Sequence, residues 1–429
     1  SPIVKDIYYD DTPDNGKDDP VWKTIVLTGL GAGGHGYFAL DITDVNNPKH
    51  LFAIQNDPSD QIVKHWDSNE IPHEYGYASG NIVDEFDYRK LGESWSTPRI
   101  IRIKVSGTDK WVAVFGGGYN GAVNPNVGSA VFVMDLEDEG RLLKVIDIED
   151  KSADIINSLP ADLSVITADG TEKANYNGAL VYAADLEGKV TKINLTENFS
   201  LICPSGKTCN KDTDKVIKNI SATTLFIAES TSENGRYIYT RPEVTINNDN
   251  KLWLYFGTGN TQKLHEQSNK IKNRVYGIKD KDFPNYVNIS TPGDIRRCKT
   301  APACPGSTDL GWYANLPRAQ KLTAEPTVDK DRVYFPIYEP TTSTNACNTG
   351  KAILTAYDTK CGNSVLNVNL GTGVLSKVVV QGDNLYIGIA GEAKKNIAGF
   401  TSTGNLITGK SKAKSSGGKV QLEGWKENY

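Results

Sequence analysis

The chain carries a loose internal repeat, and this repeat limits the available folds more than any other feature. Four segments open with a residue, a proline and a run containing Ile or Val, and each continues as a short alternating strand. These openings are Ser1–Val4, Thr97–Ile100, Arg241–Val244 and Glu325–Val328. Proline cannot donate to a β-ladder, so it belongs at the first residue of a strand or on an edge strand. The innermost strand of a propeller blade is such an edge.

A second and a third strand follow each opening. The second strand is apolar and often ends in glycine, as in Thr24–Gly29, Trp111–Gly118, Trp253–Gly259 and Val333–Ile337. The third combines small, aromatic or aliphatic residues and runs into a polar turn at Asp, as in Gly36–Asp41, Ala130–Asp135, Val275–Asp280 and Ala352–Asp358. Leu180–Leu195 and Leu385–Phe400 repeat the second and third strands, which makes six recognisable units.

This rhythm predicts an all-β fold, a β-propeller of four-stranded antiparallel blades that forms one domain over residues 1–429. A single propeller can exceed the usual domain length of roughly 100–200 residues because it grows by adding blades. The intervals are irregular because loops such as Ser59–Lys90 and Thr261–Asn273 interrupt them. A two-sheet β-sandwich is the alternative, but it would not explain the strand-opening prolines.

Charge and hydropathy exclude several classes of protein. The net charge is −5 and no basic stripe occurs, so no nucleic acid partner is expected. No apolar run approaches the ~20 residues of a membrane span. The sequence opens with Ser inside a strand-like run, and we therefore expect a C-terminal fragment of a longer secreted protein.

The six cysteines fall into three local pairs, Cys203/Cys209, Cys298/Cys304 and Cys347/Cys361. Short loops hold their ends close together, so the spacing predicts three hairpin disulfides and an oxidising compartment. Free thiols are the alternative. A zinc site would show C-x2-C pairs with His nearby, and none occurs.

The glycine runs and histidines carry no catalytic pattern. Gly29–Gly34 and Gly116–Gly118 lead into strands rather than helices, which favours tight turns over a phosphate cradle. The histidines lack metal spacing, and His65 and His73 lie in a long polar insertion. We expect no enzyme activity and no organic cofactor.

An acidic loop, DDTPDNGKDD, follows the first strand-like run. Its alternate positions carry the oxygen ligands that calcium prefers, with a backbone carbonyl between them. These positions are Asp10, Thr12, Asp14, Gly16 and Asp18. Asp, Asn, Gly and Pro are also ordinary turn formers, so a solvated hairpin turn is the alternative.

Several longer stretches are distinctive. They are WKTIVLTGLGAGGHGYFALDITD from Trp22, ESWSTPRI from Glu93 with WVAVFGGGYNG from Trp111, LVYAADLEGKVTKINL from Leu180 and the terminal EGWKENY. These stretches resemble the C-terminal domain of the PilC/PilY family of type IV pilus tip-associated adhesins. The resemblance runs from residue 1 to residue 429.

The resemblance implies a seven-bladed modified propeller. It also implies that most of the first blade is missing from this sequence. It further implies a periplasmic and then surface-exposed protein at the pilus tip that supports pilus biogenesis, twitching motility, resistance to retraction and cell adhesion. The implied partners are minor pilins and a host-cell or abiotic surface receptor.

The family's calcium loop would correspond to Asp169–Ala179, DGTEKANYNGA. The stretch keeps Asp169, Glu172, Asn175 and Asn177. It departs from the pattern by placing Lys173 among them and Ala179 where a terminal Asp is expected. We therefore expect this site to be degenerate.

Two other functions remain as alternatives. A quinoprotein dehydrogenase propeller would show regularly spaced Trp-docking motifs and often adjacent cysteines, whereas this chain has 7 Trp without regular spacing. A carbohydrate-binding lectin would use aromatic platforms, for which the chain offers 20 Tyr, 7 Trp and 11 Phe.

Calorimetric titration tests the acidic loop. If calcium binds, Asp14→Ala should weaken binding most, because Asp11 and Asp19 can replace Asp10 and Asp18 whereas the middle carboxylate has no neighbouring substitute. Equal heats from the wild type and Asp14→Ala, or no heat from the wild type, would leave the loop an ordinary acidic turn.

Overall fold

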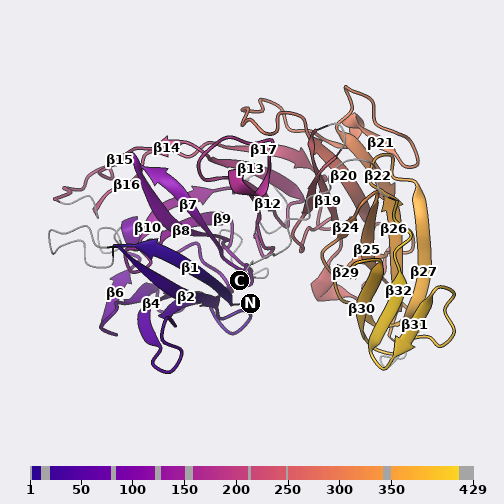
Figure 1. Cartoon of the computed structure of the whole chain (residues 1–429), viewed down its shortest axis with the longest axis horizontal. Coiled ribbons are helices and arrows are strands. Elements are labelled where there is room, and N and C mark those ends of the chain that lie inside the picture. The colour runs from indigo at the N-terminus through magenta and orange to yellow at the C-terminus, as the bar shows by residue number, and fades with distance from the viewer. Residues whose placement is uncertain are drawn as a thin grey trace. The chain divides into compact units, whose positions relative to one another are not determined.

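A computed structural model describes residues 2–10, 20–78, 84–120, 127–149, 158–210, 214–247, 250–341 and 349–414. Almost all regular structure in these residues is β-strand (Figure 1). The chain divides into two compact units, Ser1–Asp185 with Thr191–Thr223, and Leu186–Val190 with Thr224–Tyr429. Within the described residues, no helix has the length and apolarity that crossing a bilayer requires.

The first unit begins with two antiparallel sheets. Sheet one runs in chain order through β1 (Ile3–Tyr9), β2 (Val21–Gly29), β3 (Gly36–Asp41), β4 (Lys49–Asp57), β5 (Ile62–Trp66) and β6 (Pro72–Gly76). Sheet two consists of β7 (Arg99–Val105), β8 (Thr108–Gly116), β9 (Ala130–Asp135) and β10 (Leu142–Asp147), with β14 (Asn198–Phe199) added parallel to β7.

Sheet three follows, together with a small hairpin. Sheet three consists of β11 (Ser164–Thr167), β12 (Ala179–Ala184), β13 (Lys189–Leu195) and β17 (Ala222–Ile227). The boundaries between the two units fall between β12 and β13, within β13 and within β17. The hairpin pairs β15 (Leu201–Ile202) with β16 (Val216–Ile217).

The second unit contains three further sheets. Sheet four comprises β18 (Glu243–Ile246), β19 (Leu252–Gly257), β20 (Arg274–Asp280), β22 (Gly311–Asn315) and β21 (Cys298–Thr300). Sheet five comprises β23 (Lys321–Leu322), β24 (Thr327–Asp329), β25 (Arg332–Glu339), β26 (Lys351–Asp358) and β27 (Ser364–Thr372). Sheet six comprises β28 (Val374–Leu375), β29 (Val379–Gln381), β30 (Asn384–Ala390), β31 (Phe400–Thr403) and β32 (Leu406–Lys410).

These six sheets correspond one to one with the six sequence units, and the expected all-β fold is confirmed. Most sheets contain more than four strands. Insertions add strands to sheet one, whereas in sheets five and six two short strands pair with the same partner, β23 and β24 with β25, and β28 and β29 with β30. The insertion assigned to a loop at Ser59–Lys90 contains β5, β6 and a 3₁₀ turn at Asp84–Phe86. His65 therefore lies in a strand, where it is buried and its Nε2 lies 2.9 Å from the carbonyl oxygen of Glu139. The remaining 3₁₀ turns described are Ala168–Gly170, Thr261–Lys263 and Ile295–Arg297.

Alternating side chains of the middle strands pack into two different hydrophobic cores, one on each face of the sheet. In β8, Ala113 and Phe115 join the core shared with sheet one, while Val112 and Val114 join the core shared with sheet three. In the second unit, Ile353 packs in the core with sheet four, whereas its neighbour Leu354 packs in the core with sheet six. Successive side chains of a strand point to opposite faces, so a sheet covered on both faces needs a nearly continuous apolar strand.

The strand-opening prolines immediately precede β1, β7, β18 and β24, as the repeat predicts. The residues beside them join neighbouring sheets. In the first unit, the backbone N–H of Thr97 donates to the carboxylate of Asp162 at 2.6 Å. In the second, the Glu325 carboxylate accepts from Arg241 at 3.1 Å and from Lys377 at 3.0 Å. The prolines thus mark positions where polar contacts link one repeat to the next.

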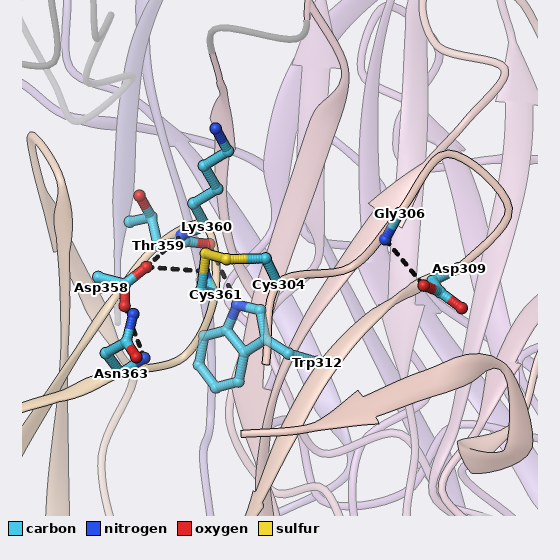
Figure 2. The surroundings of a disulfide bond; sticks show 9 residues. All are labelled: Cys304, Gly306, Asp309, Trp312, Asp358, Thr359, Lys360, Cys361 and Asn363. Carbon is cyan, nitrogen blue, oxygen red and sulfur yellow. Dashed lines mark hydrogen bonds between the residues drawn. A yellow bond between two sulfur atoms is a disulfide. The ribbon is translucent and has the colours of Figure 1, made fainter. Parts of the chain in front are cut away.

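The turn between β26 and β27 is organised by one carboxylate (Figure 2). Asp358 accepts hydrogen bonds from the backbone N–H groups of Lys360, Cys361 and Asn363 at 3.1, 2.6 and 2.6 Å. The carbonyl of Thr359 in this turn accepts from the buried indole N–H of Trp312 at 3.1 Å. At Gly362 the chain has φ +71, and a Cβ there would lie 2.7 Å from the Trp312 ring, so only glycine fits.

The same turn carries a disulfide that corrects two of the expected pairings. Cys304 bonds to Cys361, so the predicted pairs Cys298–Cys304 and Cys347–Cys361 are wrong (Figure 2). Sequence spacing misses this bond because it joins sheet four to sheet five across a separation of 57 residues. The third prediction, Cys203–Cys209, is confirmed. Cys298 is a free thiol, and Cys347 lies outside the described residues.

The two disulfides should stabilise the protein to different extents. On the chain-entropy model, closing the long loop with Cys304–Cys361 contributes about 4 kcal/mol and closing the short loop with Cys203–Cys209 about 2 kcal/mol. We expect the double variant Cys304→Ala/Cys361→Ala to lose clearly more stability in denaturant unfolding than Cys203→Ala/Cys209→Ala. Equal losses, or a Cys298–Cys304 peptide in a non-reducing digest, would contradict the assignment.

Candidate functional site

The acidic loop proposed for calcium leaves the first sheet at the paired ends of β1 and β2, where Tyr9 faces Val21. Asp10 follows β1 directly and is half-buried. Thr12, Asp14, Gly16 and Asp18 lie outside the described residues. The calcium assignment therefore stays a prediction.

The loop that resembles the family's calcium site lies between β11 and β12. Asp169 belongs to the 3₁₀ turn Ala168–Gly170, and Glu172, Asn175 and Asn177 follow with exposed side chains. The hydroxyl of Tyr176 anchors the loop by donating to the Ile166 carbonyl at 2.9 Å. In the described part of the chain, no three His, Cys, Asp or Glu side chains gather as metal ligands would.

A groove of about 600 Å³ in the first unit brings this loop next to the origin of the acidic loop. Its walls come from the β1–β2 hairpin, from β7 and β8, and from the β11–β12 loop. The lining residues include Lys5, Tyr8, Trp22, Ile100, Ile101, Arg102, Asp109, Trp111, Thr167, Asp169, Tyr176 and Asn177. The β1–β2 hairpin and the β11–β12 loop therefore border one groove, although they lie far apart along the chain.

Aromatic rings form two walls of the groove. Tyr8 and Trp22 are cross-strand partners whose ring centroids lie 5.1 Å apart. Trp111 is held by a hydrogen bond from its indole N–H to the Tyr8 carbonyl at 3.2 Å. The guanidinium of Arg102 lies over the Trp111 ring, 5.5 Å from its centroid, in a cation–π contact. The contacts among Tyr8, Trp22, Trp111 and Arg102 thus fix the aromatic walls of the groove.

A polar side chain from each neighbouring element completes the groove. Arg102 forms an ion pair with Asp109 at 3.7 Å, and both side chains are about half-exposed. Across the groove, Asp169 and Asn177 reach solvent from the β11–β12 loop. Among the lining residues Lys5 and Arg102 balance Asp109 and Asp169, so the groove has no strong charge of either sign.

A larger cavity, of about 930 Å³, lies in the second unit. Three of its charged residues are paired with one another, because Glu339 contacts Lys351 at 2.6 Å and Arg318 at 3.5 Å. Burial opposes ionisation of Glu339, but hydrogen bonds from Lys351 and Gln320 lower the pKa of this carboxyl overall. Nearby, burial lowers the pKa of Lys321 to about 8.

The remaining reactive groups have structural surroundings. Burial, with smaller contributions from Asp294 and Asp309, raises the pKa of the Cys298 thiol to about 12, so the thiol is protonated at neutral pH and a poor nucleophile. In the second glycine run, Gly118 has φ +85, and a Cβ there would lie 2.0 Å from the Glu93 carbonyl oxygen. That glycine permits a close approach of two backbone segments.

The expectation of aromatic sugar platforms from composition names no particular residue, so it does not single out Tyr8, Trp22 and Trp111. The available signal was local. Tyr8 alternates with the buried residues Ile7 and Tyr9, so it occupies a solvent-facing position of its strand, where a large aromatic side chain is unusual. Trp22 lies one residue into β2, between the exposed Val21 and the charged Lys23. The contact of Trp111 with Tyr8 forms only in the tertiary structure, so the spacing of residues along the chain does not predict it.

The fold and its repeated sheets agree with comparisons to known proteins. Residues 2–298 match the PilY1 beta-propeller domain, and the chain belongs to this family. The chain is 24% identical over 419 residues to a type IV pilus biogenesis factor PilY1 homolog of Xylella fastidiosa, with 90% of this chain and 25% of that protein covered. It is 25% identical over 313 residues to type IV pilus biogenesis factor PilY1 of Pseudomonas aeruginosa, with 70% and 22% covered. The chain thus spans about a quarter of the length of these relatives.

A solved structure shows the same fold. The C-terminal domain of Pseudomonas aeruginosa PilY1 superimposes with a TM-score of 0.59 at 16% sequence identity, covering 91% of this chain and 83% of that one. The chain is therefore a β-propeller of the PilY1 type, as the sequence resemblance implied.

Proposed function

We propose that this chain is the propeller domain of a type IV pilus biogenesis factor that acts at the pilus tip. The observation that carries the proposal is membership of the PilY1 beta-propeller family across residues 2–298. Relatives that match most of this chain carry the name of pilus biogenesis factors. The expected partners are minor pilins on one side and a host-cell or abiotic surface receptor on the other.

The proposed role has two parts, support of pilus extension against retraction and attachment of the tip to surfaces. Its location is the periplasm, then the outer membrane and the cell surface. The Cys203–Cys209 and Cys304–Cys361 disulfides support this location, because such bonds persist in oxidising compartments. A calcium ion in the acidic loop remains part of the proposal.

We assign the domain no catalytic step. The groove in the first unit offers exposed rings and polar side chains at a surface, an arrangement suited to binding. Purified chain that oxidises an alcohol with a dye acceptor would contradict this assignment and favour the quinoprotein alternative.

Shearing of pili from the source bacterium tests the proposal. Deleting this domain from the full-length protein should strongly reduce the sheared pilin, and the intact protein should co-purify with the pili. In a background where retraction is blocked, pili should return if the domain counters retraction. Normal pilus yield after the deletion, with the protein absent from sheared pili, would refute the proposed function.

A further inference from the structure

We propose that the groove bounded by Tyr8, Trp22, Trp111 and the β11–β12 loop binds a neutral carbohydrate, with a pyranose ring stacked on the Tyr8–Trp22 platform. The biological use of such a site, attachment of the pilus tip to a glycan, rests on the proposed function. The binding itself does not.

The first observation is the exposure of the two rings. Trp22 is 65% exposed and Tyr8 47%, and they are the only aromatic side chains in this exposure class among the described residues. Large aromatic side chains are usually buried, because each removes a large apolar area from water. Two exposed rings in contact with each other, at the edge of a groove, indicate a surface that a ligand covers.

The second observation is the chemistry of the remaining walls. A pyranose has one face of C–H groups, which packs on an aromatic ring, and a rim of hydroxyls that both donate and accept hydrogen bonds. The carboxylate of Asp169 and the carboxamide of Asn177 can serve that rim, because both are exposed beside the groove and neither side chain takes part in any hydrogen bond described. Asp109 and Arg102 offer a second polar pair at the opposite wall.

The third observation concerns charge and size. Two basic and two acidic side chains line the groove, so a neutral sugar fits it better than a sialylated or sulfated one. A volume of about 600 Å³ lies within the range of ~300–1,000 Å³ that small-molecule sites occupy. The hydrogen bond from Trp111 to the Tyr8 carbonyl and the cation–π contact with Arg102 hold the walls in place before any ligand arrives.

Proline-rich peptides also dock on aromatic grooves. The sugar is favoured because Asp169 and Asn177 line the groove with hydrogen-bonding groups that no described hydrogen bond uses, and a polyproline segment has no N–H to donate to that carboxylate.

Binding by the isolated chain tests the proposal directly. Wild-type protein is applied to an array of neutral and sialylated glycans and to a polyproline peptide, and the strongest hit is titrated by calorimetry. We expect a neutral glycan to bind, Trp22→Ala to weaken its affinity by about tenfold or more, and Asn177→Ala to weaken it measurably. Leu406→Ala is the matched control, because Leu406 is 45% exposed and is not among the residues that line the groove. The Leu406→Ala variant should bind the glycan with the affinity of the wild type.

Three results would overturn the proposal. They are no glycan bound on the array, unchanged affinity in Trp22→Ala with an unchanged melting temperature, and binding of the polyproline peptide instead. Trp22→Phe keeps a ring and should retain part of the affinity, which separates loss of stacking from loss of folding.

Pilus assays keep the two proposals apart. In the full-length protein, Trp22→Ala should leave the yield of sheared pili normal and reduce attachment to the glycan. If the purified chain binds a glycan but pili are normal after deletion of the domain, the carbohydrate-binding site is supported and the proposed role in pilus biogenesis is refuted.

Discussion

A carboxylate that closes the turn after the third strand recurs through the fold, and the packing of the sheets depends on it. Asp41, Asp135, Asp280 and Asp358 each end such a strand and accept a hydrogen bond from the backbone N–H two residues later, at 2.9, 3.0, 3.1 and 3.1 Å. A side-chain oxygen that binds the backbone two residues on replaces a backbone turn hydrogen bond. The repeat thereby sets where each third strand ends and how the chain returns for the next strand.

The turn at Asp358 shows how much follows from this contact. Its backbone carries Cys361 to the disulfide with Cys304, and the Thr359 carbonyl accepts from both Trp312 and Tyr255 at 3.1 and 2.8 Å. In the first unit, Asp135 accepts from Lys110 at 2.6 Å. Glu137, two residues on, accepts from the backbone N–H of Trp111, which lines the proposed glycan groove. A polar turn at the end of a buried strand therefore orders side chains of the neighbouring strand as well as its own hairpin.

Sequence alone predicts the repeated part of this structure, because Pro at the strand start and Asp at the strand end are local signals. Leu180–Leu195 and Leu385–Phe400 lack an obvious opening, and their second and third strands predict a unit at each; the two stretches lie in separate sheets. The strands in the Ser59–Lys90 insertion are not predicted, because β6 is a polar, largely exposed edge strand and β5 alternates through a buried histidine, His65, rather than through apolar residues alone. The Cys304–Cys361 bond and the approach of Trp111 to Tyr8 join segments from different sheets, and no spacing rule reveals such contacts.

The most direct measurement of this account is the unfolding of variants at Asp358. Asp358→Ala removes the acceptor of three backbone N–H groups, so it should cost about 2–4 kcal/mol, whereas Asp358→Asn keeps one carbonyl oxygen and should cost less. Asp383→Ala is the control, because it removes only an exposed ion pair with Lys330 and should cost under about 1 kcal/mol. If Asp358→Ala instead unfolds at the same denaturant concentration as the wild type and Asp383→Ala, the turn does not hold the sheets and the account is wrong.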